Sequence, residues 1–216
     1  MTAEGKRRLV IVAGWVVAFV AALLLDRAVA VAVAPIVQTV KHSPITPVIK
    51  FPGWFPCTAL IAVGISLWHP WRWRGGGTLL VTGIVAGAMY TIAKWVAGRV
   101  RPIKVIAPFD FSPFPEGFAG LFTADNMSFP SGHATLAFAS AATLAHLLPR
   151  YKRLFYTVAA VVGIERVLEQ AHYLSDVVAA AAFGIGAFHI SLFVLSRMFA
   201  PREPESRATP TEVNPT

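Results

Sequence analysis

The chain has 216 residues, of which 56% are hydrophobic and only 14% are charged. A soluble globular domain carries about 25% charged residues, so this composition excludes an ordinary soluble fold and indicates one membrane-embedded folding unit. The net charge of +8 does not indicate a nucleic-acid binder, because the cations fall at the ends of apolar runs and form no basic face. The single cysteine, Cys57, excludes an internal disulfide and a multi-cysteine metal site.

Six apolar runs follow one another along the chain. About 20 apolar residues cross the hydrocarbon core of a bilayer, and a helical run shorter than that crosses it by continuing into its polar ends. We therefore predict an all-α fold, a six-transmembrane-helix bundle in a single domain over residues 1–200. The runs are 9–33, 54–68, 78–96, 134–148, 154 into the polar stretch 165–176, and 177–199.

The segments between the runs are more polar or rich in proline. Residues 38–50 contain two prolines and predict a loop, and residues 69–77 predict a basic turn. The long segment 102–129 carries six phenylalanines, and its part from residue 103 is a candidate lid for a lipid chain. Residues 201–216 lack the apolar content needed to pack, so we predict a disordered cytoplasmic tail.

The first apolar run has two interpretations. Residues 28–30, Ala-Val-Ala, resemble the cleavage site of a secretory signal peptide. The length of the run and the charged pair Asp26 and Arg27 just before that site favour a retained helix. The charged pair either forms a local ion pair, which we expect, or lies in the bundle interior.

The loops indicate an orientation. Basic residues cluster near the N-terminus, in residues 72–74 and 150–153, and after the last run, all on one side if the spans number six. By the positive-inside rule that side is the cytoplasm, so the protein is predicted to lie in the cell (inner) membrane with both termini inside. The polar stretches 94–102, 130–133 and 165–176 then meet at the outer, periplasmic face.

Three cations in these stretches are candidate ligands for a phosphate group: Lys94, Arg101 and Arg166. The arginine guanidinium matches phosphate oxygens with a planar fork, and lysine adds a point charge. The alternative for Lys94 and Arg101 is a side chain that reaches for lipid headgroups. The alternative for Arg166 is a pair with Glu165 or Glu169.

The second polar stretch leads into an apolar helix with the residues Pro130, Ser131, Gly132 and His133. Backbone N–H groups at a helix N-terminus form an anion site, and Gly132 lets a ligand approach the backbone closely. Ser131 either caps the helix or donates to phosphate. His133 is a candidate general acid, with an interfacial histidine of no catalytic role as the alternative.

The third stretch contains His172 and Asp176, four residues apart. On one continuous helix these side chains share a face. A carboxylate on one imidazole nitrogen fixes the tautomer and leaves the other nitrogen free to attack, which makes His172 a candidate nucleophile. We expect Ser175 to cap the last helix.

Together the three stretches resemble the motifs of the type 2 phosphatidic acid phosphatases, integral-membrane enzymes related to vanadium haloperoxidases. The first motif is Lys94, six residues, then Arg101 and a proline. The second is Pro-Ser-Gly-His ending at His133, and the third runs from Arg166 through His172 to Asp176. The family usually has serine before the third-motif arginine, where this chain has Glu165.

The resemblance implies metal-independent hydrolysis of a lipid phosphate or diphosphate, such as phosphatidate or undecaprenyl diphosphate, without a cofactor. It implies that His172 forms a phosphohistidine, that Asp176 orients it, and that His133 protonates the leaving group. The phosphate ligands it implies are Lys94, Arg101, Ser131, Gly132 and Arg166. The expected partners are the lipid phosphate and membrane lipids, and no nucleic acid is expected. The sequence does not indicate an oligomeric state. Alternatives are a lipid phosphotransferase and a non-catalytic anion binder or transporter.

Overall fold

A computed structural model describes residues 2–68, 72–123 and 127–199 of the chain, and the predicted tail 201–216 lies outside them. The described residues form helices, turns and one isolated bridge between Arg99 and Phe111, with no β-strand, which confirms the all-α prediction. The α-helices are α1 Ala3–Val33, α2 Val37–Lys41, α3 Thr46–Lys50, α4 Phe55–Trp68, α5 Arg72–Ala97, α6 Gly132–Leu147, α7 Lys152–Leu168 and α8 Leu174–Met198. Short 3-10 turns are η1 Ala34–Ile36, η2 Phe51–Gly53, η3 Gly117–Leu121 and η5 Pro149–Tyr151.

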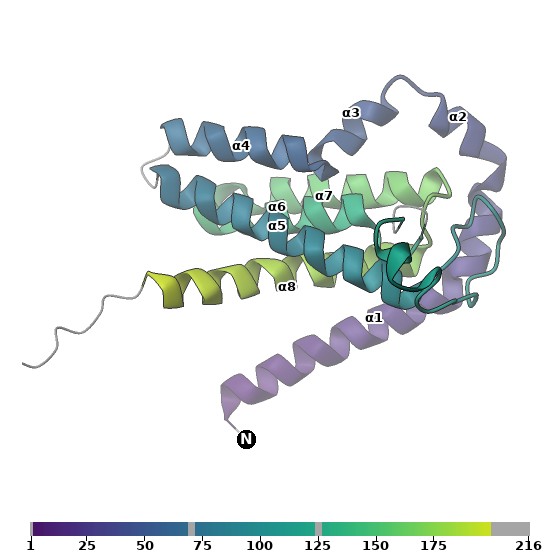
Figure 1. Ribbon diagram of the computed structural model, residues 1–216, viewed down its shortest axis with the longest axis horizontal. Coiled ribbons are helices and arrows are strands. Elements are labelled where there is room, and N and C mark those ends of the chain that lie inside the picture. The colour runs from purple at the N-terminus through teal and green to yellow at the C-terminus, as the bar shows by residue number, and fades with distance from the viewer. Residues whose placement is uncertain (1, 69–71, 124–126, 200–216) are drawn as a thin grey trace, which may run out of the picture.

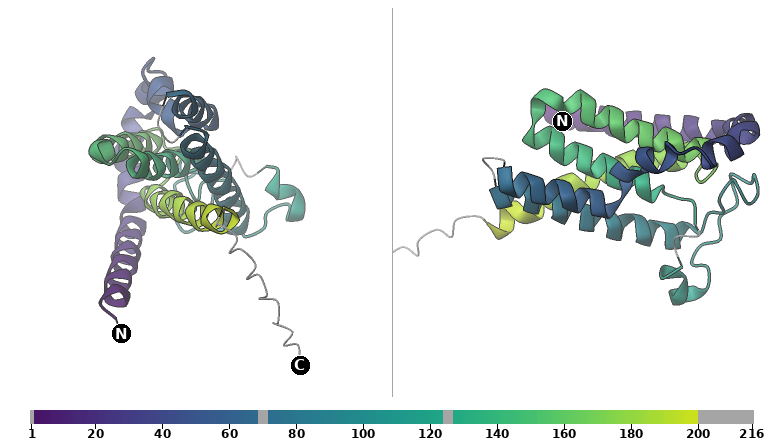
Figure 2. Two further views of the ribbon diagram at one scale, coloured as in Figure 1. Left: turned by 90° about the vertical axis from the view of Figure 1, so that its left-hand side faces the viewer. Right: turned by 90° about the horizontal axis from the view of Figure 1, so that it is seen from above.

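Helix α6 is the centre of the bundle. It packs against α5, α7 and α8, and α4 packs along α5 (Figures 1 and 2). Half of the buried residues of α6 are alanine, and small residues let helix backbones approach closely inside a membrane. The shared packing holds the ends of α5, α7, α6 and α8 together at one end of the bundle.

Helix α1 touches the bundle along one stripe only. Of its 31 residues, just Ala22, Asp26 and Ala30 are buried, and they are spaced four apart on one face. This stripe contacts α8, while the N-terminal part of α1 diverges from the bundle (Figures 1 and 2). The exposed remainder is largely aliphatic, as expected for a helix surrounded by lipid.

Three helical stretches among the described residues are long and apolar enough to cross a bilayer: Ala3–Lys41, Trp73–Ala97 and Leu174–Met198. A fourth candidate is the pair Thr46–Gly53 and Phe55–Trp68, which is bent by 64°. Helices α6 and α7 have 16 and 17 residues and are shorter than these. The structure thus supports a membrane-spanning protein, and the count of six spans stays a prediction.

Two segments differ from the predicted boundaries. The predicted loop 38–50 contains α3 and most of α2. Pro47 is compatible with α3 because it occupies the first turn, where its missing N–H costs nothing. Residues 72–77 of the predicted turn belong to α5, while residues 69–71 lie outside the described part. A Cβ on Gly76 would lie 2.1 Å from Ser66 Oγ, so the glycine allows α4 and α5 to pack closely.

The segment after α5 folds back on that helix. Gly98 ends α5 with a φ of +57°, a conformation that favours glycine. The ring of Trp95 packs against Phe114 and Phe118 at centroid distances of 4.9 and 6.2 Å. These contacts anchor part of the 103–129 segment, and its function as a lid stays a prediction.

Candidate active site

Five of the eight predicted site residues line one cavity of about 390 Å³. The cavity lies at the end of the bundle where α5 and α7 end and α6 and α8 begin (Figure 1). Apolar and aromatic residues from the start of α4 and from α5 and α6 complete its wall. The five residues are Lys94, Arg101, Gly132, His133 and His172; the other lining residues are Gly53, Trp54, Phe55, Pro56, Tyr90 and Leu136.

His172 is not on a helix continuous with Asp176, contrary to the prediction. Helix α7 ends at Leu168, and Gln170 adopts a φ of +52° in the turn that follows. The chain then returns so that His172 Nδ1 lies 3.8 Å from Asp176 Oδ2. The nearer partner is the carbonyl oxygen of Ser128, at 2.7 Å from Nδ1. Because a carbonyl only accepts, Nδ1 carries the proton and Nε2 keeps its lone pair.

Burial lowers the pKa of the His172 imidazole to about 4. The Asp176 carboxylate acts in the opposite direction, and the ammonium of Lys94 adds to the effect of burial. The ring is therefore neutral at pH 7, which is the form that a nucleophile requires.

Asp176 is held by several donors in the first turn of α8. Its Oδ2 accepts hydrogen bonds from the backbone N–H of Tyr173, at 2.8 Å, and from the hydroxyl of Ser128, at 2.5 Å. The prediction that Ser175 caps this helix is wrong, because the N-cap is Tyr173 and Asp176 accepts its N–H. The carboxylate is thereby fixed beside His172.

Arg99 and Asp26 are site neighbours that the sequence did not reveal. The fully buried guanidinium of Arg99 binds Asp176 Oδ1 through Nη1 and Asp26 Oδ2, at 2.7 Å, through Nη2. The expected local pair of Asp26 with Arg27 is not formed, because adjacent side chains on a helix do not face each other and Arg27 is exposed. The sequence signal that could have indicated this buried network is the carboxylate of Asp26 within an apolar run.

His133, in the first turn of α6, lines the same cavity and is partly exposed. Its Nε2 accepts a hydrogen bond from the indole N–H of Trp54, just before α4. Since the indole only donates, Nε2 carries no proton and the neutral ring holds its proton at Nδ1. Trp54 stands at the start of the apolar run 54–68, and nothing in the sequence pattern indicates its contact with His133.

Lys94 and Arg101 both line the cavity. The side chain of Lys94 is buried, and its Nζ donates to the carbonyl oxygen of Met127 at 2.8 Å, so it does not extend to a headgroup region. Ser131 occupies the N-cap position of α6 without a side-chain capping bond. Its hydroxyl oxygen is buried and has no hydrogen-bond partner within the described part of the chain.

Arg166 does not line the cavity. Its Nε and Nη2 bind both carboxylate oxygens of Glu165, at 2.6 and 2.7 Å, and Nη2 also binds Glu169 at 2.5 Å. Lys50, in α3, approaches Glu169 at 2.5 Å and Glu165 at 4.0 Å. The two cations and two carboxylates form a cluster with no net charge, which we call the Lys50 cluster. The sequence predicted the acid pairing as an alternative but gave no sign of Lys50.

Several proteins of known name are similar to the chain in sequence. A lipid A 1-phosphatase of Rhizobium etli is 40% identical over 111 residues, 50% of this chain and 45% of that protein. An undecaprenyl-diphosphatase of Sulfolobus acidocaldarius is 27% identical over 133 residues, 61% of this chain and 58% of that protein. The matches therefore cover about half the length of these relatives.

A solved structure has a similar fold. The PAP2-type phosphatidylglycerolphosphate phosphatase of Bacillus subtilis superposes with a TM-score of 0.56 at 22% identity, over 88% of this chain and 98% of that one. The sequence profile of the PAP2 superfamily matches residues 75–199, from α5 through α8 and across all three motifs. The predicted family resemblance is thus confirmed: the chain belongs to the PAP2 superfamily.

Proposed function

We propose that this protein hydrolyses the phosphate or diphosphate group of a membrane lipid through a phosphohistidine intermediate. The observation that carries the proposal is the cavity, where two histidines and two cations from distant segments surround one volume of about 390 Å³. The relatives named lipid A 1-phosphatase and undecaprenyl-diphosphatase support the same class of substrate. The apolar wall around Trp54 and Phe55 suits the part of a lipid nearest its phosphate.

The first chemical step is attack by His172 Nε2 on phosphorus. The hydrogen bond from Nδ1 to Ser128 holds the lone pair on Nε2, and the depressed pKa keeps the ring neutral. As the N–P bond forms, the bond from phosphorus to the lipid oxygen breaks. His133, protonated while the phosphate dianion is bound, donates a proton from its imidazolium form to the departing oxygen, and the attacking water later returns a proton to the neutral ring. A water molecule then attacks phosphorus, the N–P bond breaks, and inorganic phosphate leaves.

The positive groups around the cavity stabilise the charge on the transferring phosphoryl group. Lys94 and Arg101 supply formal charge, and the backbone N–H groups at the start of α6 supply the positive end of the helix dipole. The buried hydroxyl of Ser131 is a further donor near the same turn. Arg166 does not line the cavity and lies in the neutral Lys50 cluster, where Glu165 stands in place of the serine usual in the family. No step requires a metal ion.

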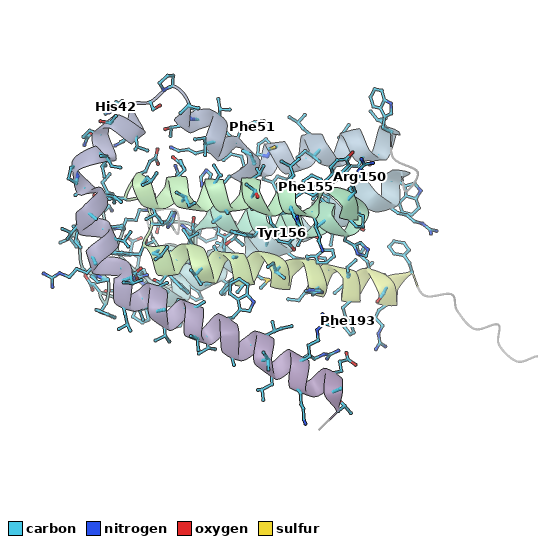
Figure 3. The ribbon with its side chains drawn as sticks, turned by 180° about the vertical axis from the view of Figure 1, so that it is seen from behind. His42, Phe51, Arg150, Phe155, Tyr156 and Phe193 are labelled. Atoms are coloured by element: carbon cyan, nitrogen blue, oxygen red, sulfur yellow. The ribbon has the colours of Figure 1, made fainter. Side chains whose placement is uncertain are left out.

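Residues 1–200 are proposed to act as one domain with six spans, cytoplasmic termini and the cavity at the outer face. Figure 3 supports this arrangement, since Arg150 of the basic turn lies at the opposite end of the molecule from His42. A Cys57→Ser protein carrying either Lys104→Cys or Arg150→Cys tests it with a membrane-impermeant maleimide on intact cells. We expect labelling at residue 104 alone; labelling at residue 150 alone reverses the orientation.

Phosphate release by the purified protein tests the reaction. The panel comprises lipid A carrying a 1-phosphate, undecaprenyl diphosphate, undecaprenyl phosphate, phosphatidate and phosphatidylglycerophosphate, each with and without a chelator. We expect release from at least one lipid, unchanged by the chelator and abolished by His172→Ala. Release that survives His172→Ala contradicts the nucleophile, and release that stops in chelator contradicts the metal-free reaction.

A further inference from the structure

A set of buried charges connects helix α1 with the nucleophile. The side chains of Asp26, Arg99 and Asp176 are all 0% exposed, and the guanidinium lies between the two carboxylates. Burying ions inside a protein is costly unless they are paired and hydrogen-bonded. Asp26 also lies outside residues 75–199, the part matched by the family profile. Its burial in an otherwise lipid-exposed helix calls for a function.

Arg99 uses its whole donor set within the protein. Nε and Nη2 donate to the carbonyl oxygen of Pro108, at 3.0 and 2.6 Å, and Nη2 also donates to Asp26. Nη1 donates to Asp176 and, at 2.8 Å, to the hydroxyl of Ser175. The guanidinium stacks 4.1 Å from the ring centroid of Tyr173. With all five N–H donors engaged, Arg99 has none left for a substrate.

Asp26 is equally engaged. Its Oδ1 accepts the backbone N–H of Ser175 at 2.9 Å, and Oδ2 accepts the hydroxyl of the same serine at 2.5 Å. The carboxylate thus sits at the positive N-terminal end of α8, the helix that carries Asp176. It fixes both Arg99 and the first turn of α8.

The network ends at the nucleophile through Ser128. The Ser128 hydroxyl donates to Asp176, its backbone N–H donates to the carbonyl oxygen of Arg99 at 2.7 Å, and its own carbonyl accepts from His172. Two carboxylates and one guanidinium leave the network with one net negative charge. When His172 bonds to phosphorus its ring becomes cationic, so this charge favours the phosphorylated form.

We infer that Asp26 and Arg99 are positioning residues for His172, acting through Asp176 and Ser128. Helix α1 is then a part of the active site and not only a membrane anchor. The inference builds on the proposed phosphohistidine chemistry, and it adds residues that do not touch the substrate.

The test compares Asp26→Asn with the wild type and with Glu4→Gln, which removes an exposed carboxylate from the same helix. In Asp26→Asn we expect kcat on lipid A 1-phosphate, corrected for the folded fraction, to fall about tenfold or more while KM stays unchanged. A loss of this size is expected when a reacting group is misplaced. Glu4→Gln should match the wild type. Unchanged kcat in folded Asp26→Asn, or a rise in KM alone, overturns the inference.

The pH profile separates positioning from a structural contribution. His172 faces Asp176, Lys94, Arg101 and His133, and none of these groups changes in the variant. Removing a negative charge from the network disfavours the protonated ring, so the acid limb of kcat/KM moves to lower pH. A loss of active protein lowers the whole profile without moving the limb, and that result also overturns the inference.

Binding of orthovanadate gives a readout that needs no turnover. Vanadate adopts the five-coordinate geometry of phosphoryl transfer, so its affinity reports the geometry of the nucleophile. We expect Asp26→Asn to bind vanadate about tenfold more weakly while phosphate binding changes little, in keeping with the cost of misplacement. Equal loss of both ligands, or of neither, contradicts the inference. A wild type that binds vanadate but hydrolyses no lipid contradicts the proposed function alone.

Should Asp26→Asn fail to fold, Arg99→Lys decides the question. The lysine keeps the charge but lacks the fork that joins both carboxylates. Positioning predicts a lower kcat and weaker vanadate binding at constant KM. A raised KM with constant kcat assigns Arg99 to substrate binding and overturns the inference.

Discussion

The two histidines face one cavity from differently built sides. His172 is buried, and the groups behind it form a hydrogen-bonded network that reaches through Asp176 and Arg99 to Asp26. His133 is partly exposed, and its ring accepts a hydrogen bond from the indole N–H of Trp54. The first side has buried charges from α1, α8 and the loop after α5, while the second is lined by aromatic residues at the start of α4.

This difference matches what each proposed step requires. A nucleophile must hold one orientation through attack, so its partners are numerous and rigid. An acid must deliver a proton to a leaving oxygen whose position depends on the lipid, so a less constrained ring is suited to it. We therefore expect changes on the His172 side to reduce turnover for every substrate, and changes on the His133 side to depend on the leaving group.

The largest expected loss follows from His172→Ala. Without the nucleophile, turnover should fall by about 10⁴-fold or more, as for other covalent catalysts. Protein incubated with ³²P-labelled lipid phosphate carries a label in the wild type, and His172→Ala should lose it; the quench is alkaline detergent, because phosphohistidine is acid-labile. His189→Ala, a change in an exposed histidine of α8, is the matched control. Retained labelling in His172→Ala would assign the phosphoenzyme to another residue.

Changing His133 tests the asymmetry directly. His133→Ala should lower kcat on a lipid phosphate by about 10²–10³-fold, the usual contribution of a general acid. With p-nitrophenyl phosphate the loss should nearly vanish, because nitrophenolate leaves without protonation. His42→Ala, in the exposed turn after α2, is the control. An equal loss on both substrates would show that His133 does not act as the acid.

Much of the cavity was predictable from sequence because its residues sit at the ends of apolar runs. The order of the runs put Lys94, His133 and His172 at one end, and the structure brings all three to one cavity. The residue types then limited the chemistry, since two imidazoles and two cations around one cavity suit phosphate transfer.

The network behind His172 was not predictable, because its members are distant in sequence. Asp26 and Arg99 are 73 residues apart, and local pattern offered Arg27 as the obvious partner. The break after α7 was also hidden. It depends on the left-handed Gln170, whose side chain donates to the carbonyl oxygen of Ala30 in α1. The buried charge network and the turn after α7 both depend on tertiary contacts with α1. The hydrophobic periodicity of the sequence does not predict such contacts.

The pH dependence of the nucleophile follows from its burial. The pKa of His172 lies at about 4, below its ordinary value, so the reactive neutral form persists from pH 7 down to that value. Below it, kcat/KM should fall about tenfold per pH unit as the ring gains a proton. Protein returned to pH 7 after acid exposure controls for unfolding. An acid limb near pH 6.5 would mean that the ring is solvated.

The Lys50 cluster supports Arg166 and should affect binding more than turnover. Lys50→Met leaves two carboxylates and one guanidinium beside an anion site, so the cluster gains one net negative charge. We expect this charge to raise KM about tenfold and to change kcat little, because one unpaired ion repels the anionic substrate. Lys50→Met with Glu169→Gln restores neutrality and should recover most of the affinity. Lys41→Met, an exposed lysine of α2, is the control. An unchanged KM in Lys50→Met would make the cluster purely structural.

The smallest effect is expected for Trp54→Phe. Phenylalanine keeps an aromatic wall but removes the N–H that donates to His133 Nε2, so the ring of His133 becomes free to change tautomer. We expect kcat on a lipid phosphate to change by about two- to fivefold, the worth of one hydrogen bond. Combined with His133→Ala the substitution should add nothing, because the bond is already lost. Additive losses would instead place Trp54 in contact with the lipid, and the aromatic side of the cavity would then determine which substrates bind.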